Sequence, residues 1–188
     1  MKERRNQDLF VPAIAAELGI GLAALLAGWT IRMNPFAGIT FSAESLIWGC
    51  AAALPPLVLL YLLQKTSIPA VHRLMHTSRR LIQQFFGTFS LLQIILLSAA
   101  AGIGEELLFR GIIQAGLTGQ IGLFWSVATT SLIFGLLHFI TRGYAVYAFC
   151  MSVYLGIVYA ASGNILIPVL AHAVYDAAVL WKLSRPKA

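Results

Sequence analysis

Long apolar stretches separated by short polar segments fill nearly the whole chain. Each stretch has about 20 residues or more, which is the length that an α-helix needs to cross the hydrocarbon core of a membrane. No strand-like alternation of apolar and polar residues competes with this pattern, and lipid admits only helices or closed barrels. We therefore predict an all-α, polytopic transmembrane helical bundle of about six spans, at residues 10–31, 43–63, 88–117, 121–140, 144–162 and 164–183.

The polar segments divide the chain into three predicted parts. Residues 1–87 hold two N-terminal transmembrane helices and a basic interfacial segment, KTSIPAVHRLMHTSRR. Residues 88–183 hold a core of four helices, and residues 184–188 form a basic tail. Pro55 and Pro56 predict a kink in the second span, because proline removes a backbone hydrogen bond from a helix. Most of the ionisable residues inside apolar spans belong to the four-helix core.

Composition and charge agree with a membrane protein. Of the 188 residues 59% are hydrophobic and only 11% are charged, and the mean hydropathy is +0.82. A soluble domain has about 25% charged residues. The net charge of +6 does not indicate a nucleic-acid partner, because the basic residues lie between apolar spans, where they set topology, and form no patch with interleaved exposed aromatics.

Lysine and arginine are distributed unevenly between the two sides of a six-span bundle. Eleven fall on one side and only Arg32 falls on the other. The positive-inside rule then places both termini in the cytoplasm. The eleven residues are Lys2, Arg4, Arg5, Lys65, Arg73, Arg79, Arg80, Arg142, Lys182, Arg185 and Lys187.

Simple alternation of the six spans creates a conflict of depth between two candidate site residues. Glu105 lies past the middle of an outward-running third span, whereas His138 lies near the cytoplasmic end of the fourth. The two meet only if the third helix starts late, tilts or breaks near Gly102 and Gly104.

Ionisable residues inside three of the apolar spans form the candidate site. A charged side chain at the centre of a membrane costs about 2.5–3.5 kcal/mol on insertion scales, so such residues mark a functional site by default. Carboxylates and imidazoles are also the groups of hydrolytic acid–base chemistry. The candidates are Glu105, Glu106 and Arg110 in GIGEELLFRG, His138 in FGLLHF, and His172 and Asp176 in LAHAVYD.

Helical spacing predicts which of these side chains face one another, because residues four apart share a helix face. Glu106 is expected to pair with Arg110, which neutralises a buried carboxylate. Glu105 is rotated about 100° away and points into a different space. Two further pairs share a face: His172 with Asp176, which can orient the imidazole or fix its tautomer, and Phe134 with His138, whose rings can pack together.

Glu105, His138 and His172 in one cavity permit two mechanisms. In the first, Glu105 deprotonates a water held by His138, and His172 donates a hydrogen bond to the developing oxyanion. In the second, the three residues bind one divalent metal ion, Zn²⁺, which lowers the pKa of its bound water to about 7. The sequence has no HExxH motif, so the zinc ligands would be scattered, and we favour the mechanism that needs no cofactor.

Structural explanations compete for several of these residues. A single intramembrane histidine is often only an interhelical hydrogen-bonding group, and a pair such as Glu106 and Arg110 is more often structural than catalytic. Glu17 stands alone in the first span, and we interpret it as a helix-packing or interface residue. His72 and His76 lie four apart among arginines, where a basic segment facing lipid headgroups explains them better than a metal site.

The three motifs together resemble those of the CPBP family of intramembrane endopeptidases. That family includes the CAAX prenyl-protein endopeptidase and bacterial relatives that are also described as Abi proteins. Its pattern is EExxxR, then FxxxH, then HxxxN or HxxxD, on successive core helices. The pattern is met by Glu105, Glu106 and Arg110, by Phe134 and His138, and by His172 and Asp176, and the resemblance covers residues 91–180.

The resemblance implies a helical-bundle protease in which Glu105 and His138 activate water. His172 and Asp176 would form the oxyanion site. An ionised Asp176 cannot donate a hydrogen bond, so it must be protonated or act through His172. The supporting residues would be Glu106, Arg110 and Phe134.

The resemblance also implies a location and a substrate class. The short chain is similar to bacterial relatives, which implies the plasma membrane and a membrane-associated peptide or protein substrate. The family has been described both as metalloproteases and as glutamate proteases, so the metal question stays open. Some relatives confer bacteriocin immunity or assist the assembly of other membrane proteins, and a non-proteolytic membrane factor is therefore the alternative function. A small transporter is a third, less favoured hypothesis.

Overall fold

The computed structural model describes residues 9–185, and this part of the chain is built from helices. The predicted all-α membrane bundle is confirmed. Lys2, Arg4, Arg5, Lys187 and the end of the predicted basic tail lie outside the described residues. The elements are α2 (Phe10–Ile31), α3 (Ala43–Ala51), α4 (Leu54–Lys65), α5 (Pro69–Phe86), α6 (Leu91–Glu106), the π-helical η1 (Leu107–Gln114), α7 (Ala115–Leu137), α8 (Arg142–Ser162) and α9 (Leu166–Ser184).

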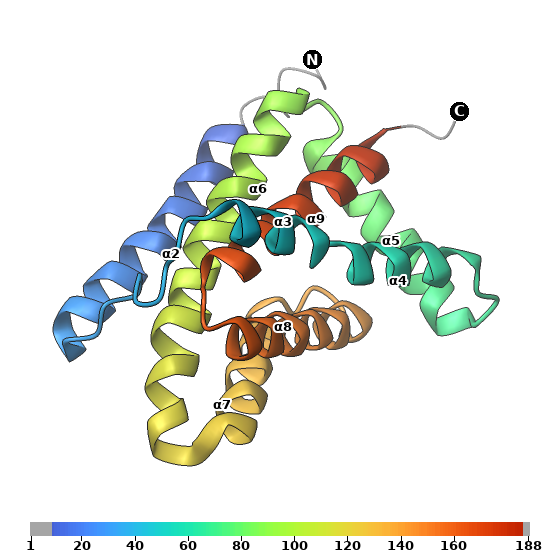
Figure 1. Cartoon of the computed structure of the whole chain (residues 1–188). Coiled ribbons are helices and arrows are strands. Elements are labelled where there is room, and N and C mark those ends of the chain that lie inside the picture. Colours follow the sequence, from blue (N-terminus) through green and yellow to red (C-terminus); the bar gives the residue numbers. More distant parts are fainter. Residues whose placement is uncertain (1–8, 186–188) are drawn as a thin grey trace.

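The predicted spans are all present, but two of them are joined. Within residues 9–185, five helical stretches are long and apolar enough to cross a membrane, because the third and fourth predicted spans run on as Leu91–Leu137. Gly122, with a φ of 79°, divides that stretch. A left-handed φ suits glycine, which has no Cβ. Figure 1 shows the chain turning back at the lower end of the molecule, so the stretch makes two runs.

Close helix packing at the centre depends on small residues. Helix α6 packs against both α2 and α9, and these three lie side by side in Figure 1. A Cβ on Gly104 would come within 2.6 Å of the Glu17 carbonyl oxygen in α2, and a Cβ on Gly102 within 2.8 Å of the Val169 carbonyl oxygen in α9. Glycines therefore let the backbones touch at the level of the predicted site, as small residues do in membrane bundles.

The second predicted span is interrupted where the prolines indicate. Helix α3 ends at Ala51 and α4 begins at Leu54, with Pro55 in its first turn. Helix α5 then covers the basic segment and is strongly amphipathic, with an apolar side that includes Leu81 and Ile82 and with Arg73 and Arg80 exposed. It packs against α4, α8 and α9.

The position of the chain reversal removes the conflict of depth. Gly122 lies 17 residues after Glu105 and 16 residues before His138. An antiparallel hairpin folded at Gly122 therefore brings these two side chains to the same level, since each residue rises about 1.5 Å along a helix. Of the three possibilities that the sequence leaves open, the break near Gly102 and Gly104 does not occur, because α6 runs through both glycines without interruption. The irregular segment is η1, which begins directly after the glutamates.

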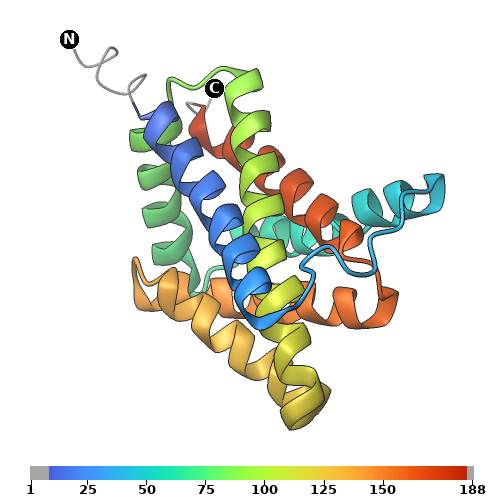
Figure 2. The same ribbon diagram turned by 90° about the vertical axis from the view of Figure 1, so that its left-hand side faces the viewer.

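The ends of three helices support an even number of crossings. Helix α2 begins, α6 begins and α9 ends at one end of the molecule (Figure 2). There the Phe10 and Phe89 rings meet edge to face at 5.7 Å, and Arg185 donates a hydrogen bond of 2.9 Å to the Phe89 carbonyl oxygen. Asn164, between α8 and α9, donates to the Thr40 carbonyl oxygen at 2.9 Å and so joins the α8–α9 connection to the α2–α3 connection.

We predict that both termini face the cytoplasm. Reporter fusions at the C-terminus and in the segment Thr118–Gln120 should report opposite sides, because three crossings, the fourth, fifth and sixth spans, separate them. The measurement is the activity of compartment-specific reporters in intact cells. A C-terminus that reports the outside would contradict the six-span arrangement and require an odd number of crossings.

Candidate functional site

A cavity of about 640 Å³ contains the four residues predicted to be catalytic. Its wall is mostly apolar and comes from α2, α4, α5, α6, α7, α8 and α9, together with the segment after α7. An enclosed apolar cavity with a few convergent polar groups is the usual form of a binding or active site. The polar residues that converge here include Glu105, His138, His172 and Asp176.

Glu105 lies between the two histidines. One carboxylate oxygen is 3.6 Å from His138 Nε2, and the other is 3.8 Å from His172 Nε2. The Glu105 side chain is 8% exposed and the His138 side chain 28% exposed, so the group opens to the cavity on the His138 side. These separations are longer than direct hydrogen bonds.

His138 is oriented by the end of its own helix. It caps the C-terminus of α7, and its Nδ1 lies 2.9 Å from the Phe134 carbonyl oxygen. A carbonyl oxygen only accepts hydrogen bonds, so Nδ1 carries the proton and Nε2 of the neutral ring presents a lone pair. The Phe134 ring stacks on the imidazole at 4.2 Å, as their shared helix face predicts. In the neutral form of the ring, His138 Nε2 is thus an acceptor beside Glu105.

The predicted ion pair between Glu106 and Arg110 is present. Arg110 Nη1 lies 3.0 Å from Glu106 Oε1, and both side chains are fully buried. Arg110 Nη2 also donates to the carbonyl and hydroxyl oxygens of Ser152 in α8, at 2.7 and 3.0 Å. The pair therefore ties η1 to α8, which the spacing alone does not reveal.

Glu106 makes a second contact that the sequence does not predict. Its Oε1 accepts a hydrogen bond of 2.8 Å from His172 Nδ1 in α9. An imidazole held by a carboxylate in this way has a fixed tautomer and a fixed ring orientation. Glu106 thus orients His172, a task that the sequence assigns to Asp176 alone.

Asp176 lies on the other side of the same ring. Its Oδ2 is 3.4 Å from His172 Nε2, which also lies 3.8 Å from Glu105. His172 Nδ1 donates its hydrogen to Glu106, so Nε2 of a neutral His172 ring would point a lone pair at the carboxylates of Asp176 and Glu105. A ring protonated on both nitrogens instead donates from Nε2 into the cavity, which is the donor that an oxyanion site needs.

A metal ion at this site would be held by Glu105, His138 and His172. Imidazole nitrogen and carboxylate oxygen are donors that zinc accepts, and each Nδ1 is held by an oxygen, as in most metal-ligating histidines. Within residues 9–185, however, no group of three His, Cys, Asp or Glu side chains is arranged to hold a metal ion. The donor types fit zinc, and the mechanism without a metal stays a prediction.

The structure adds residues that sequence analysis left aside. Glu17 lines the cavity although we expected only a packing or interface role. Tyr147 and Tyr175 also line it and share a hydrogen bond between their hydroxyl groups. The signal for Glu17 was its position inside an apolar span, and the signal for Tyr175 was its place within the HAVYD motif.

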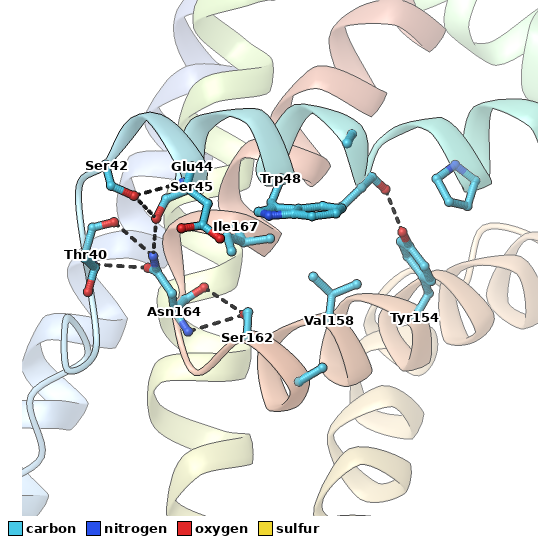
Figure 3. Close-up of a pocket in the computed structure, with 14 residues that line it drawn as sticks. Thr40, Ser42, Glu44, Ser45, Trp48, Tyr154, Val158, Ser162, Asn164 and Ile167 are labelled. Carbon is cyan, nitrogen blue, oxygen red and sulfur yellow. Dashed lines mark hydrogen bonds between the residues drawn. The ribbon is translucent and has the colours of Figure 1, made fainter.

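A second groove, of about 740 Å³, lies between α3, the start of α4, and α8 (Figure 3). Asn164 organises one end of it by donating to Thr40 and to the Ser45 hydroxyl, at 2.9 Å each. None of the candidate site residues lines this groove. Its titratable lining residues are Glu44 and Tyr154, so the groove lacks the acid–base groups of the first cavity.

Comparisons with known proteins identify the region that holds the motifs. Residues 87–178 match the family model described as "Type II CAAX prenyl endopeptidase Rce1-like". The uncharacterized protein YpbD of Bacillus subtilis is 36% identical over 98 residues, which cover 50% of this chain and 48% of that protein. The chain thus matches about half the length of this curated relative. No solved structure gives a significant match.

The two adjacent glutamates should respond differently to amidation. Glu105 makes no direct hydrogen bond within the described residues, so Glu105→Gln should leave the amount of folded protein unchanged. Glu106→Gln should lower it, because breaking a buried ion pair costs about 3–5 kcal/mol. The measurement is the yield of monodisperse protein extracted from membranes in mild detergent. Equal yields of the two variants would contradict the assigned role of Glu106.

Proposed function

Because residues 87–178 belong to the Rce1-like family of type II CAAX prenyl endopeptidases, we propose that the protein is an intramembrane endopeptidase. It hydrolyses a peptide bond of a membrane-associated peptide or protein, and Glu105 with His138 activates the attacking water. One observation supports this most: the Glu105 carboxylate lies 3.6 and 3.8 Å from two imidazole Nε2 atoms at the wall of an apolar cavity.

In the proposed first step, Glu105 accepts a proton from a water molecule. His138 Nε2 accepts a hydrogen bond from the other hydrogen of that water and so aims its oxygen lone pair at the scissile carbonyl carbon. A carbon–oxygen bond forms, and the carbonyl electron pair moves to the oxygen. Glu105 then gives the proton to the leaving nitrogen as the carbon–nitrogen bond breaks, so the carboxylate is regenerated.

His172 stabilises the negative charge that develops on the carbonyl oxygen. Its doubly protonated ring donates from Nε2, while Glu106 holds Nδ1 at 2.8 Å. A preorganised donor in a site of low dielectric contributes more than it would in water. Asp176 keeps the ring protonated and oriented from the side that faces the cavity.

The apolar wall of the cavity fits a substrate with apolar groups next to the cleaved bond. Helix α5 contributes much of this wall, including Leu74, Leu81, Ile82 and Phe85. The description of the matched family names prenylated CAAX substrates, and for this chain we propose the broader class of membrane-associated peptides. Proteolysis is favoured over a purely structural membrane factor, since such a factor gives no reason for two oriented imidazoles around one carboxylate.

The proposal predicts that Glu105→Gln abolishes cleavage. Loss of a general base should lower the rate by about 10²–10⁴, while the protein accumulates normally. Comparative proteomics of membrane peptides from cells with the wild type and with this variant identifies the substrate. Cleavage is then measured with purified protein in liposomes, with and without a strong chelator, which should have no effect. Inactivation by the chelator and recovery with Zn²⁺ would establish the metal mechanism instead.

The last motif gives a separate prediction. Asp176→Asn retains a side chain of the same shape and gains an amide donor, so it should keep much of the activity. Asp176→Ala and His172→Ala should lose about 10²-fold or more in kcat, because they remove oxyanion stabilisation. The assay is cleavage of the identified substrate in liposomes. An inactive Asp176→Asn protein would mean that the negative charge of Asp176 is required.

A further inference from the structure

Glu17 is a carboxylate of the cavity to which the proposed mechanism assigns no task. It lines the cavity together with Glu105, His138 and His172. The charges of these three residues and of Asp176 all act on the Glu17 carboxyl group. The residue belongs to α2, which precedes the segment that matches the family model, so nothing in that match accounts for it.

The position of Glu17 is set by the same helix contact that positions Glu105. A Cβ on Gly104 would lie 2.6 Å from the Glu17 carbonyl oxygen and 3.2 Å from the Gly21 backbone nitrogen. The two backbones therefore touch one residue before Glu105. This close contact resists any shift of α2 relative to α6. The position of Glu17 relative to Glu105 is therefore fixed, as a binding group needs.

Two polar atoms of residues that line the cavity are buried and have no hydrogen-bond partner among the described residues. They are Glu17 Oε2 and Ser98 Oγ, and both residues line the cavity. A buried polar atom without a partner costs about 1–3 kcal/mol. Ser98 and Glu105 lie seven residues apart on α6 and so share its cavity face. The cavity lining thus contains a carboxylate and a hydroxyl group that each have an atom without a partner among the described residues.

A peptide substrate supplies the groups that match these atoms. A bond can be attacked only when its segment is extended, and the backbone N–H groups of that segment then have no intrachain acceptor. In a membrane each such group costs several kcal/mol until it finds one. In the proposed mechanism Glu105 and His138 act on water, and His172 is a donor. Asp176 holds the His172 ring, so Glu17 is the remaining carboxylate acceptor of the cavity.

We propose that the Glu17 carboxylate accepts a hydrogen bond from a substrate backbone N–H next to the scissile bond. This inference rests on the proposed protease function. It makes Glu17 a substrate-binding residue, and the ligand that it recognises is an extended peptide backbone.

The test combines a variant with a matched change in the substrate. The probe is a quenched fluorogenic peptide with a farnesylated CAAX tail, presented in liposomes to the full-length protein. A second set of peptides carries an N-methyl group on one amide flanking the scissile bond. In the wild type, one N-methyl peptide should lose about 10- to 100-fold in kcat/KM, as expected for a hydrogen bond to a charged group. Glu17→Leu should lower kcat/KM for the parent peptide by a similar factor, and N-methylation should then add no further loss.

Control variants separate this role from a structural one. Leucine is compatible with an apolar span, so Glu17→Leu should accumulate as the wild type does. Glu17→Gln keeps a carbonyl acceptor and should retain more activity than Glu17→Leu. Glu44→Leu alters the carboxylate of the second groove and should have no effect. Independent, multiplicative losses from Glu17→Leu and N-methylation would overturn the proposal.

Binding measurements distinguish failure of this inference from failure of the proposed function. Fluorescence anisotropy reports binding of the same peptides to Glu105→Gln and to the Glu105→Gln, Glu17→Leu double variant in nanodiscs. Binding that depends on Glu17 and on the N–H group, without hydrolysis by the wild type, would support the binding role and contradict the protease function. Normal hydrolysis by Glu17→Leu would support the protease function and contradict the binding role of Glu17. Absence of both binding and cleavage would count against both.

Discussion

The buried carboxylate of Glu106 is the constraint on which the site depends. It lies at the end of α6 and pairs with Arg110 in η1 and with His172 in α9, at 3.0 and 2.8 Å. Through Arg110 it is also connected to Ser152 in α8. A buried charge is tolerated only when it is paired and hydrogen-bonded. This requirement brings three parts of the bundle to one carboxylate and leaves one orientation for the His172 ring.

The neighbouring residue, Glu105, is left free to act on substrate and water because Glu106 makes the structural ion pair. Because Arg110 pairs with Glu106, the two imidazoles are the only cationic groups of residues 9–185 within salt-bridge distance of Glu105. The π-helical segment η1 starts directly after the pair, and such wide turns are frequent at functional sites. The two adjacent carboxylates thus have different roles. Glu106 connects helices and orients His172, whereas Glu105 faces the cavity.

Much of the fold follows from the sequence because the membrane restricts it to helices. The length of the apolar stretches predicts the helices, and Pro55 and Pro56 predict the break between α3 and α4. The location of the hairpin between the third and fourth runs was less well predicted. We placed the reversal at Thr118–Gln120 and inferred a mismatch of depth, whereas the left-handed residue Gly122 lies midway between Glu105 and His138. Hydropathy does not resolve a turn within a continuous apolar run.

In the site, as in the fold, contacts within one helix could be predicted from the sequence, whereas contacts between helices could not. Pairs four residues apart on one helix, such as Glu106 with Arg110, can be predicted from spacing. The hydrogen bond between Glu106 and His172 joins residues 66 apart in the sequence. It depends on how α6 packs against α9, and this packing cannot be predicted from residue spacing in a single sequence. Glu17 was set aside because it stands alone in its span, yet its partners in the cavity come from other helices.

The central claim is that Glu105 activates water and does not itself attack the substrate. A single turnover in water enriched in ¹⁸O, followed by mass spectrometry of the product and of the protein peptide that contains Glu105, tests it most directly. The account predicts one ¹⁸O atom in the new carboxyl terminus of the product and none in Glu105. Label in the Glu105 side chain would reveal an acyl intermediate on that carboxylate and would contradict the account.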